Sequence, residues 1–190
     1  MRRDVLETLR RLGKPFYSVA DLQKVTGLAA GSLRVFLSRW AKAGWLERIG
    51  AGLYRLPDRP LDLAGLANQR YLPSYLSFES ALSRCGIIRQ IPYVLTFATS
   101  RRSRRLRLKD TEIAYRRLKT DLFFGYRLQA GLDVAMPEKA LLDQLYFVSL
   151  GRASLSFREL NLKPIRASVL QTMAGKFPER TQRLVRQVLS

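Results

Sequence analysis

The stretch SLRVFLSRWAKAG, residues 32–44, decides the fold of the N-terminal part of this chain. Its apolar residues recur at the i, i+3, i+4, i+7 spacing of a helix that packs one side on a core. They are Leu33, Phe36, Leu37 and Trp40. The opposite side of this helix carries Ser38 together with three cations and no acid, and the cations are Arg34, Arg39 and Lys42. The stretch therefore predicts an amphipathic helix with a cationic outer face.

Two shorter helices are expected before this one. An apolar stripe ending at Gly13 predicts the first, and it consists of Val5, Leu6, Leu9 and Leu12. Ser18 and Asp21 have the spacing of a capping box with Asp in place of Glu, and Gly27 marks the end of the second helix. The short break LAAG, residues 28–31, leads into the third helix, which is the order of a helix-turn-helix.

A β-hairpin is expected after the third helix. The sequence WLERIGAGLYRLP, residues 45–57, places two short strands, about 45–49 and 53–56, around Gly50-Ala51-Gly52. Three helices followed by a hairpin predict a winged helix-turn-helix over residues 1–57. In such a domain the third helix enters the major groove of DNA, which explains short and cationic side chains on its outer face.

The net charge points to a polyanionic partner. With 34 Lys and Arg against 15 Asp and Glu, the formal charge is +19 and the isoelectric point is about 11.0. Both halves are basic, because residues 1–57 hold eleven cations against four acids and the remainder holds 23 against eleven. No apolar run approaches the roughly 20 residues of a membrane span, so insertion is not expected. Nucleic acid is favoured over a membrane surface, because the basic run at residues 101–109 contains few of the aromatic or apolar residues that anchor a protein to a membrane.

The same composition limits the compartment and the chemistry. The N-terminal sequence MRRDVLETLRRLG is too polar for a secretory signal, and a single Cys85 indicates a reducing cytoplasm. Without histidine, Ser-His-Asp and Cys-His nucleophiles are excluded, and we expect neither a cofactor nor a metal. A carboxylate–Mg²⁺ site remains the enzymatic alternative, built from Asp133, Glu138, Lys139 and Glu79. Because Glu138 and Lys139 are adjacent and point in different directions, we expect a binding protein rather than an enzyme.

The candidate DNA-contacting residues follow from this fold; they are Ser32, Arg34, Val35, Ser38, Arg39, Lys42, Arg48 and Arg55. Arg34 suits a bidentate contact to guanine and Val35 a thymine methyl, whereas Arg39, Lys42 and Arg48 suit phosphates. A cross-strand ion pair with Glu47 explains Arg55 without DNA. The alternative to the whole set is a solvated face on a protein-interaction module.

The second half predicts a mixed α/β domain with a helical C-terminus, so that the whole chain is of the α+β class. Prolines and charges at residues 56–60 mark the boundary, with a linker over 58–70 and a domain over 71–190. A helix is expected over 74–86, a strand over 93–100, and short strands over 112–118, 125–128 and 133–136. Further helices are expected from residue 136 and over about 165–176 and 178–189.

One basic run within this half admits two interpretations. Residues 101–109 carry six cations in nine positions. The run is either a solvated turn after a strand or a loop that contacts phosphates beyond the winged helix. The additional phosphate contacts would be Arg101, Arg102, Arg104, Arg105 and Arg107.

Four segments together resemble the AbiEi antitoxins, the transcriptional regulators of abortive-infection (type IV) toxin–antitoxin systems. They are WLERIGAGLYRLP at 45–57, YLSFESAL at 75–82, PYVLTFATSRR at 92–102 and, most specifically, VAMPEKALLDQLYF at 134–147. The resemblance implies a winged helix that represses its own promoter by binding operator repeats. It also implies a second domain that counteracts a nucleotidyltransferase toxin without necessarily touching it. A winged-helix regulator with no toxin partner is the alternative, and the oligomeric state stays open.

Overall fold

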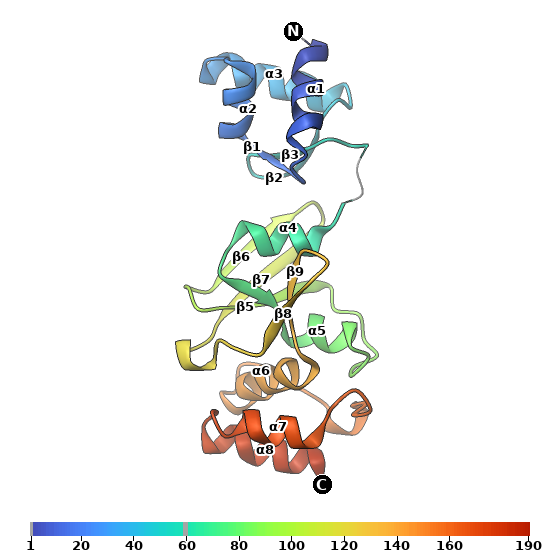
Figure 1. Cartoon of the computed structure of the whole chain (residues 1–190), viewed down its shortest axis with the longest axis vertical. Helices are drawn as coiled ribbons and strands as arrows, with labels where there is room; N and C mark the ends of the chain where they lie inside the picture. The colour runs from blue at the N-terminus through green and yellow to red at the C-terminus, as the bar shows by residue number, and fades with distance from the viewer. Residues whose placement is uncertain (1, 59–60) are drawn as a thin grey trace. The chain divides into compact units, whose positions relative to one another are not determined.

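The chain has a mixed α+β architecture (Figure 1). The computed structural model describes residues 2–58 and 61–190. They form two compact units. The first comprises Met1–Leu66 together with Arg107–Asp110, and the second comprises Ala67–Leu106 and Thr111–Ser190.

The first unit combines three helices with a small antiparallel sheet. Its elements in chain order are α1 (Arg2–Leu12), β1 (Tyr17–Ser18), α2 (Val19–Thr26), α3 (Ala30–Lys42), β2 (Glu47–Gly50) and β3 (Leu53–Arg55). The strand order is β1-β3-β2, so the expected hairpin is extended by a two-residue strand that the sequence pattern did not predict. Three residues join α2 to α3, an arrangement compatible with a helix-turn-helix.

The capping box predicted for α2 is present. The Asp21 N–H donates to Ser18 Oγ at 3.1 Å, and the Ser18 N–H donates to Asp21 Oδ2 at 2.9 Å. Lys14 Nζ lies 2.7 Å from Asp21 Oδ1, and the hydrogen bonds from Lys14 and Ser18 lower the pKa of Asp21 to about 2. Gly27 ends α2 at a φ of 68°, in the left-handed region that favours glycine.

A local hydrophobic core fixes the orientation of these helices. Leu33, Leu37 and Trp40 of α3 are buried, as the helical spacing predicted, and Phe36 is half-buried. They pack with residues of α1, α2, β1 and the two ends of the β2–β3 hairpin, namely Val5, Leu6, Leu9, Tyr17, Leu22, Leu46 and Leu56. The core side of α3 is therefore fixed, and its other side faces outward.

The segment between the units differs from the predicted linker over 58–70. Residues Leu63–Arg70 form helix α4. Arg59 and Pro60, which belong to the expected boundary, lie outside the described residues. The Asp62 side chain accepts a hydrogen bond from the Gly65 N–H at 3.0 Å, which supports the first turn of this helix. The first compact unit accordingly extends to Leu66.

The second unit is built on a six-stranded mixed sheet of order β6-β7-β5-β4-β9-β8. Its strands are β4 (Ser74–Leu76), β5 (Val94–Thr99), β6 (Arg104–Leu108), β7 (Thr111–Arg117), β8 (Tyr126–Gln129) and β9 (Leu132–Ala135). Strand β5 runs parallel to β7 and antiparallel to β4, and β4 runs parallel to β9. Neither a turn nor a loop describes the whole basic run, because its residues Arg104–Leu108 form an edge strand, β6.

The single helix expected over 74–86 is wrong in its first part. Residues Ser74–Leu76 form β4 in the middle of the sheet, and α5 begins only at Phe78 and ends at Arg84. The Ser77 backbone between them is extended, and its side chain donates to Asp143 Oδ2 at 2.7 Å. Tertiary hydrogen bonds therefore overrode the helical periodicity of this stretch.

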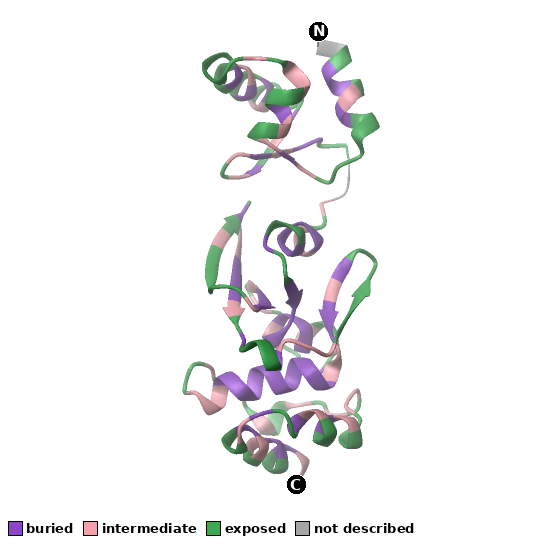
Figure 2. Ribbon diagram, turned by 60° about the vertical axis from the view of Figure 1, so that its left-hand side comes forward, coloured by how far each residue is buried: buried purple, intermediate pink, exposed green. Residues whose placement is uncertain are grey.

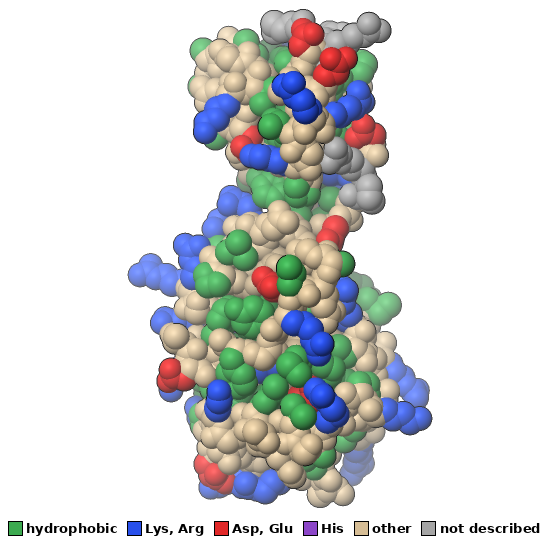
Figure 3. Space-filling view, viewed as in Figure 1, with side chains coloured by type: hydrophobic (Ala, Val, Ile, Leu, Met, Phe, Trp, Pro, Cys, Tyr) green, Lys and Arg blue, Asp and Glu red, His purple; other side chains and the backbone are tan. Residues whose placement is uncertain are grey.

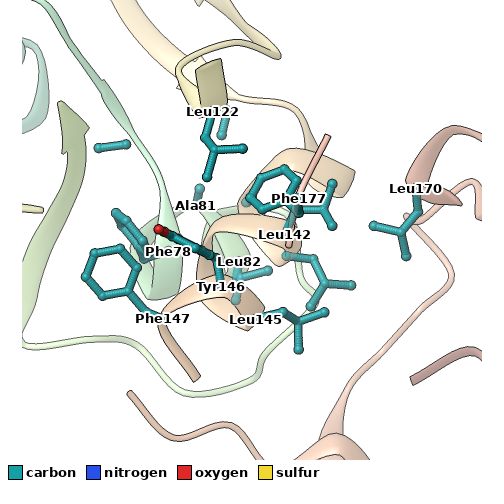
Figure 4. Packing of buried hydrophobic residues seen from close by; sticks show 14 of the residues in the cluster. Phe78, Ala81, Leu82, Leu122, Leu142, Leu145, Tyr146, Phe147, Leu170 and Phe177 are labelled. Carbon is teal, nitrogen blue, oxygen red and sulfur yellow. The ribbon is translucent and has the colours of Figure 1, made fainter. Parts of the chain in front are cut away.

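Helices cover the sheet, and α6 (Pro137–Ser149) is the most buried of them (Figure 2). Its Leu142, Leu145 and Tyr146 share a core with α5, α7 (Ala167–Ala174) and α8 (Glu179–Leu189) (Figure 4). Short 3₁₀ turns occupy Thr120–Leu122 and Phe157–Glu159. The expected C-terminal helices are confirmed in kind, with bounds shorter by one or two residues at most ends.

Candidate nucleic-acid interface

The outer face of α3 gathers most of the predicted DNA-contacting residues. Ser32, Arg34, Ser38, Arg39 and Lys42 are all exposed. At about 100° per residue they span a little under half of the helix circumference, opposite the buried face. Val35 lies among them and is 50% exposed, so an apolar side chain stands on a polar and cationic surface.

The three cations on this face have no carboxylate partner among the described residues. Ion pairs elsewhere in the first unit involve other cations, such as Arg10 with Asp58 and Lys14 with Asp21. Arg39 and Lys42 lie in the last turn of α3, where a cation also stabilises the helix dipole by about 0.3–1 kcal/mol. Arg34 lies near the start of the helix and has no such structural explanation.

The N-terminus of α3 is open to an anion. Its N-cap residue, Ala29, provides no side-chain hydrogen bond, and the first turn contains no acid. The free N–H groups of a first helical turn attract phosphate through hydrogen bonding and the helix dipole. Gly31 in this turn is exposed, and a Cβ atom there would meet nothing within 4 Å. The early residues of α3 are therefore sterically accessible.

The glycines of the β2–β3 hairpin have a structural role in the fold. Gly52 adopts a φ of 67°, and its carbonyl accepts a hydrogen bond from the Val19 N–H at 3.1 Å. This bond ties the turn to the start of α2. Arg48 is exposed on β2, and its Nε donates to the Gly50 carbonyl at 3.3 Å. The hairpin thus presents one cation, held close to its own backbone.

Arg55 differs from the other predicted contacts because it is buried and paired. It lies directly opposite Glu47 in the β2–β3 register, and its Nε is 2.6 Å from Glu47 Oε2. Its side chain is only 11% exposed. Lys109, which belongs to the same compact unit, also ion-pairs with Glu47. The cross-strand pair expected from the sequence is therefore present and accounts for Arg55.

The arginines of the basic run divide between two environments. Arg101 and Arg102 follow β5, whereas Arg104, Arg105 and Arg107 lie on the edge strand β6, and all five are exposed. Arg105 is paired with Glu112 at 2.5 Å. Figure 3 shows Lys and Arg side chains spread over the surface of both units on the face it displays. Cations on an edge strand also discourage unwanted strand pairing, so charge alone does not define a site here.

The residues considered for a carboxylate–lysine site are not brought together. Glu138 is 2.8 Å from Arg166 Nε, and Glu79 is 2.9 Å from Arg116 Nη1. Lys139 pairs with Asp143 in the interior. Asp133 is half-buried, and its N–H donates to Asn68 Oδ1 at 3.1 Å. In the described part of the chain, no group of three or more His, Cys, Asp and Glu residues is placed to hold a metal ion.

One cluster that the sequence did not indicate is a hollow in the second unit. It is lined by Tyr71, Ser100, Arg101, Arg102 and Arg117. Tyr71 lies 30 residues before the basic run and Arg117 is on the strand after it, so only the fold shows that they line one hollow. None of the described helices is long and apolar enough to cross a bilayer.

Comparison with known proteins places the first unit in a functional class. Residues 3–57 match the family described as "Transcriptional regulator, AbiEi antitoxin". The matched residues comprise α1 to β3, the elements that carry the α3 face. By class, then, the matched region is that of a transcriptional regulator. More particularly, residues 3–57 are similar to the AbiEi antitoxin family, which confirms the resemblance seen in the sequence. No curated protein is detectably similar to the chain.

Proposed function

We propose that the protein is a sequence-specific repressor that binds double-stranded DNA and serves as the antitoxin of a type IV abortive-infection pair. The observation that carries the DNA-binding part is the outer face of α3. Three cations, two hydroxyls and an exposed Val35 share that face, and no acid interrupts it. Within residues 2–58 and 61–190, no carboxylate pairs with these cations. This combination suits a major groove, where bases offer hydrogen-bond acceptors and methyl groups between two rows of phosphates.

In this proposal the first unit acts as a winged helix-turn-helix with α3 as the recognition helix. Arg34 donates two hydrogen bonds to a guanine, and Val35 contacts a thymine methyl. Ser32 and Ser38 supply further hydrogen bonds. The phosphates are held by Arg39, Lys42 and, from the hairpin, Arg48. The uncapped first turn of α3 adds backbone N–H groups for one more phosphate.

The proposed interface no longer includes Arg55. Its guanidinium is committed to Glu47 inside the sheet, so a DNA contact would have to break a partly buried ion pair. The arginines of β6 extend the proposed footprint instead. Arg104, Arg105 and Arg107 would contact backbone phosphates without contributing to base recognition.

The antitoxin part of the proposal rests on the family match of residues 3–57. We propose that the regulated promoter is the protein's own and that the operator consists of repeats upstream of its gene. The functional partner would be a nucleotidyltransferase-type toxin in the same operon, which the second unit counteracts without an obligatory direct contact. The proposed site of action is the cytoplasm, where both the DNA and the toxin are accessible.

Binding of the full chain to its own upstream region tests the DNA-binding part. Fluorescence anisotropy at physiological salt should show binding to this duplex at least about 10³-fold tighter than to a shuffled duplex of the same composition. Footprinting would then locate the repeats. Equal affinity for both duplexes would contradict a sequence-specific repressor.

Co-expression with the product of the neighbouring gene tests the antitoxin part. Growth arrest caused by that product alone, and relieved by this protein, is the expected result. A chain that binds its operator but gives no relief would instead be a regulator without a toxin partner. Duplex binding and relief of growth arrest therefore test the two parts of the proposal separately.

A further inference from the structure

The hollow in the second unit lies where the end of β5 meets the start of the basic run. Its volume is about 540 Å³, and its lining consists of Tyr71, Ser100, Arg101, Arg102 and Arg117. Three of the five lining residues are arginines, and none is an acid. Pockets of roughly 300–1,000 Å³ are the size that binds small molecules in proteins.

The backbone around this hollow is held in place by four hydrogen bonds, of which three are partly buried. The Tyr71 hydroxyl donates to the Arg102 carbonyl at 2.9 Å, and the Arg101 N–H donates to Thr99 Oγ1 at 3.1 Å. Thr99 Oγ1 in turn donates to the Pro73 carbonyl at 2.8 Å. The Arg117 N–H donates to Ser103 Oγ at 3.1 Å, which links β7 to the start of the basic run. The segment is therefore preorganised rather than a free loop.

Arg101 is oriented by two contacts on one side of its guanidinium. Its Nη1 donates to the Leu72 carbonyl at 3.0 Å, and its Cζ lies 4.7 Å from the centroid of the Tyr71 ring. Tyr71 is itself buried and packs on Tyr115, with ring centroids 4.9 Å apart. The contact with this ring and the hydrogen bond to Leu72 together restrain the Arg101 guanidinium beside the hollow.

The three arginines of this hollow are not paired with carboxylates in the second unit, unlike two arginines on the adjacent strands. Arg105 is paired with Glu112 and Arg116 with Glu79, on the adjacent strands β6 and β7. In residues 61–190, by contrast, no carboxylate is paired with Arg101, Arg102 or Arg117. Three like charges around one hollow repel one another, and a bound anion would relieve that repulsion.

We propose that this hollow binds the pyrophosphate group of a small phosphorylated ligand. Guanidinium groups match phosphate oxygens with paired N–H donors, and Ser100 adds a hydroxyl. A pyrophosphate group carries two or more negative charges within a few ångströms, which suits a hollow lined by three cations better than a single phosphodiester charge does. The group can come from inorganic pyrophosphate or from a nucleoside triphosphate, which presents the same phosphates.

Isothermal titration calorimetry on the full chain tests this site with inorganic pyrophosphate and with ATP as separate probes. The variant Arg102→Gln/Arg117→Gln removes two of the three cations, and neither side chain has a hydrogen bond to another residue that the structure describes. The matched control is Arg127→Gln together with Arg152→Gln, which removes the same charge from exposed positions elsewhere in this unit. We expect pyrophosphate binding that weakens at least about ten-fold in the first variant and less than two-fold in the control.

The outcomes separate the sources of the phosphate. Equal affinity for both probes means that the pyrophosphate group alone is recognised, and tighter binding of ATP means that the nucleoside contributes; both support the site. Equal loss in the control variant, or no binding of either probe, overturns the proposal. The proposal is also overturned if the double variant changes only the salt dependence of duplex binding, because Arg102 and Arg117 would then contact DNA. Operator recognition by α3 does not depend on any of these results.

Discussion

The Lys139 ammonium and the Asp143 carboxylate form an ion pair one turn apart on α6, and both side chains are completely buried. Lys139 Nζ also donates to the Tyr75 hydroxyl at 2.7 Å, and that hydroxyl donates to Asp143 Oδ2 at 3.0 Å. Ser77 Oγ provides a further donor to the carboxylate at 2.7 Å. Burial raises the pKa of Asp143 and lowers that of Lys139, whereas the attraction between the two groups opposes both shifts.

Removing one member of this pair should therefore destabilise the second unit strongly. We expect Asp143→Ala to lower its free energy of unfolding by about 3–5 kcal/mol, because an uncompensated ammonium remains in the interior. Replacing both charges, as in Lys139→Met/Asp143→Leu, should cost much less. Urea unfolding followed by circular dichroism measures both changes. A single variant that is as stable as the double one would contradict a charge-pair role.

Arg34→Ala tests the base contact assigned to α3. The variant should lose about 1–3 kcal/mol of operator affinity and discriminate less between base pairs at one position. Anisotropy against a panel of operators with single substitutions measures both effects. An unchanged base preference would remove Arg34 from the recognition face. Arg55→Gln is the internal comparison, since it should reduce folding stability more than specificity.

Lys42→Ala tests a phosphate contact on the same helix. We expect weaker binding to all sequences alike and a decrease of about one in the slope of log K against log salt. The slope is obtained by repeating the titration between about 50 and 200 mM salt. A loss confined to the operator sequence would instead show that Lys42 reads bases.

Neutralising the edge strand tests whether DNA extends beyond α3. In Arg104→Gln/Arg105→Gln/Arg107→Gln, the salt slope should fall by up to about three if each arginine contacts a phosphate. Operator preference should be retained, because backbone contacts do not read sequence. If the slope matches that of the wild type, these arginines belong to the solvated edge of the sheet.

The capping box gives the first unit an acid-sensitive contribution to stability. The pKa of Asp21 is about 2 in the folded chain, against 3.8 for the unperturbed group. The stabilisation, on the order of 1–2 kcal/mol, is therefore present above about pH 4 and is lost as the pH falls toward 2. Both tryptophans, Trp40 and Trp45, lie in this unit, so their fluorescence reports its unfolding. Asp21→Asn should flatten this pH dependence, whereas the exposed Asp110→Asn should leave it unchanged.

Local patterns predicted the first unit well because its determinants are close in the sequence. The stripe of α3, the capping box at Ser18 and the stop at Gly27 each depend on residues within a few positions of one another. The second unit was harder to predict. The apolar spacing of residues 74–86 predicted that the β4 segment is helical, and its pairing with β5 and β9 makes it a strand instead.

Contacts between distant segments also explain why the sequence did not predict the buried ion pair of Lys139 and Asp143. The pattern MPEKALLD predicted a helix with a leucine stripe, and Leu141, Leu142 and Leu145 are indeed buried. It gave no indication that Lys139 and Asp143 are buried as well, since their partners Tyr75 and Ser77 come from a distant segment. The hollow beside Tyr71 was missed for a similar reason, because Arg117 reaches it only through the sheet.

The hydrophobic cluster of the first unit draws all its members from Val5 to Leu56. During synthesis this cluster can therefore assemble as soon as about the first third of the chain has left the ribosome. Strand β4, by contrast, pairs in parallel with β9, which is translated much later. The α3 face would then be ready for operator DNA before the rest of the protein has been translated. If the proposed operator lies in its own promoter, a nascent chain would bind there before the second unit has formed.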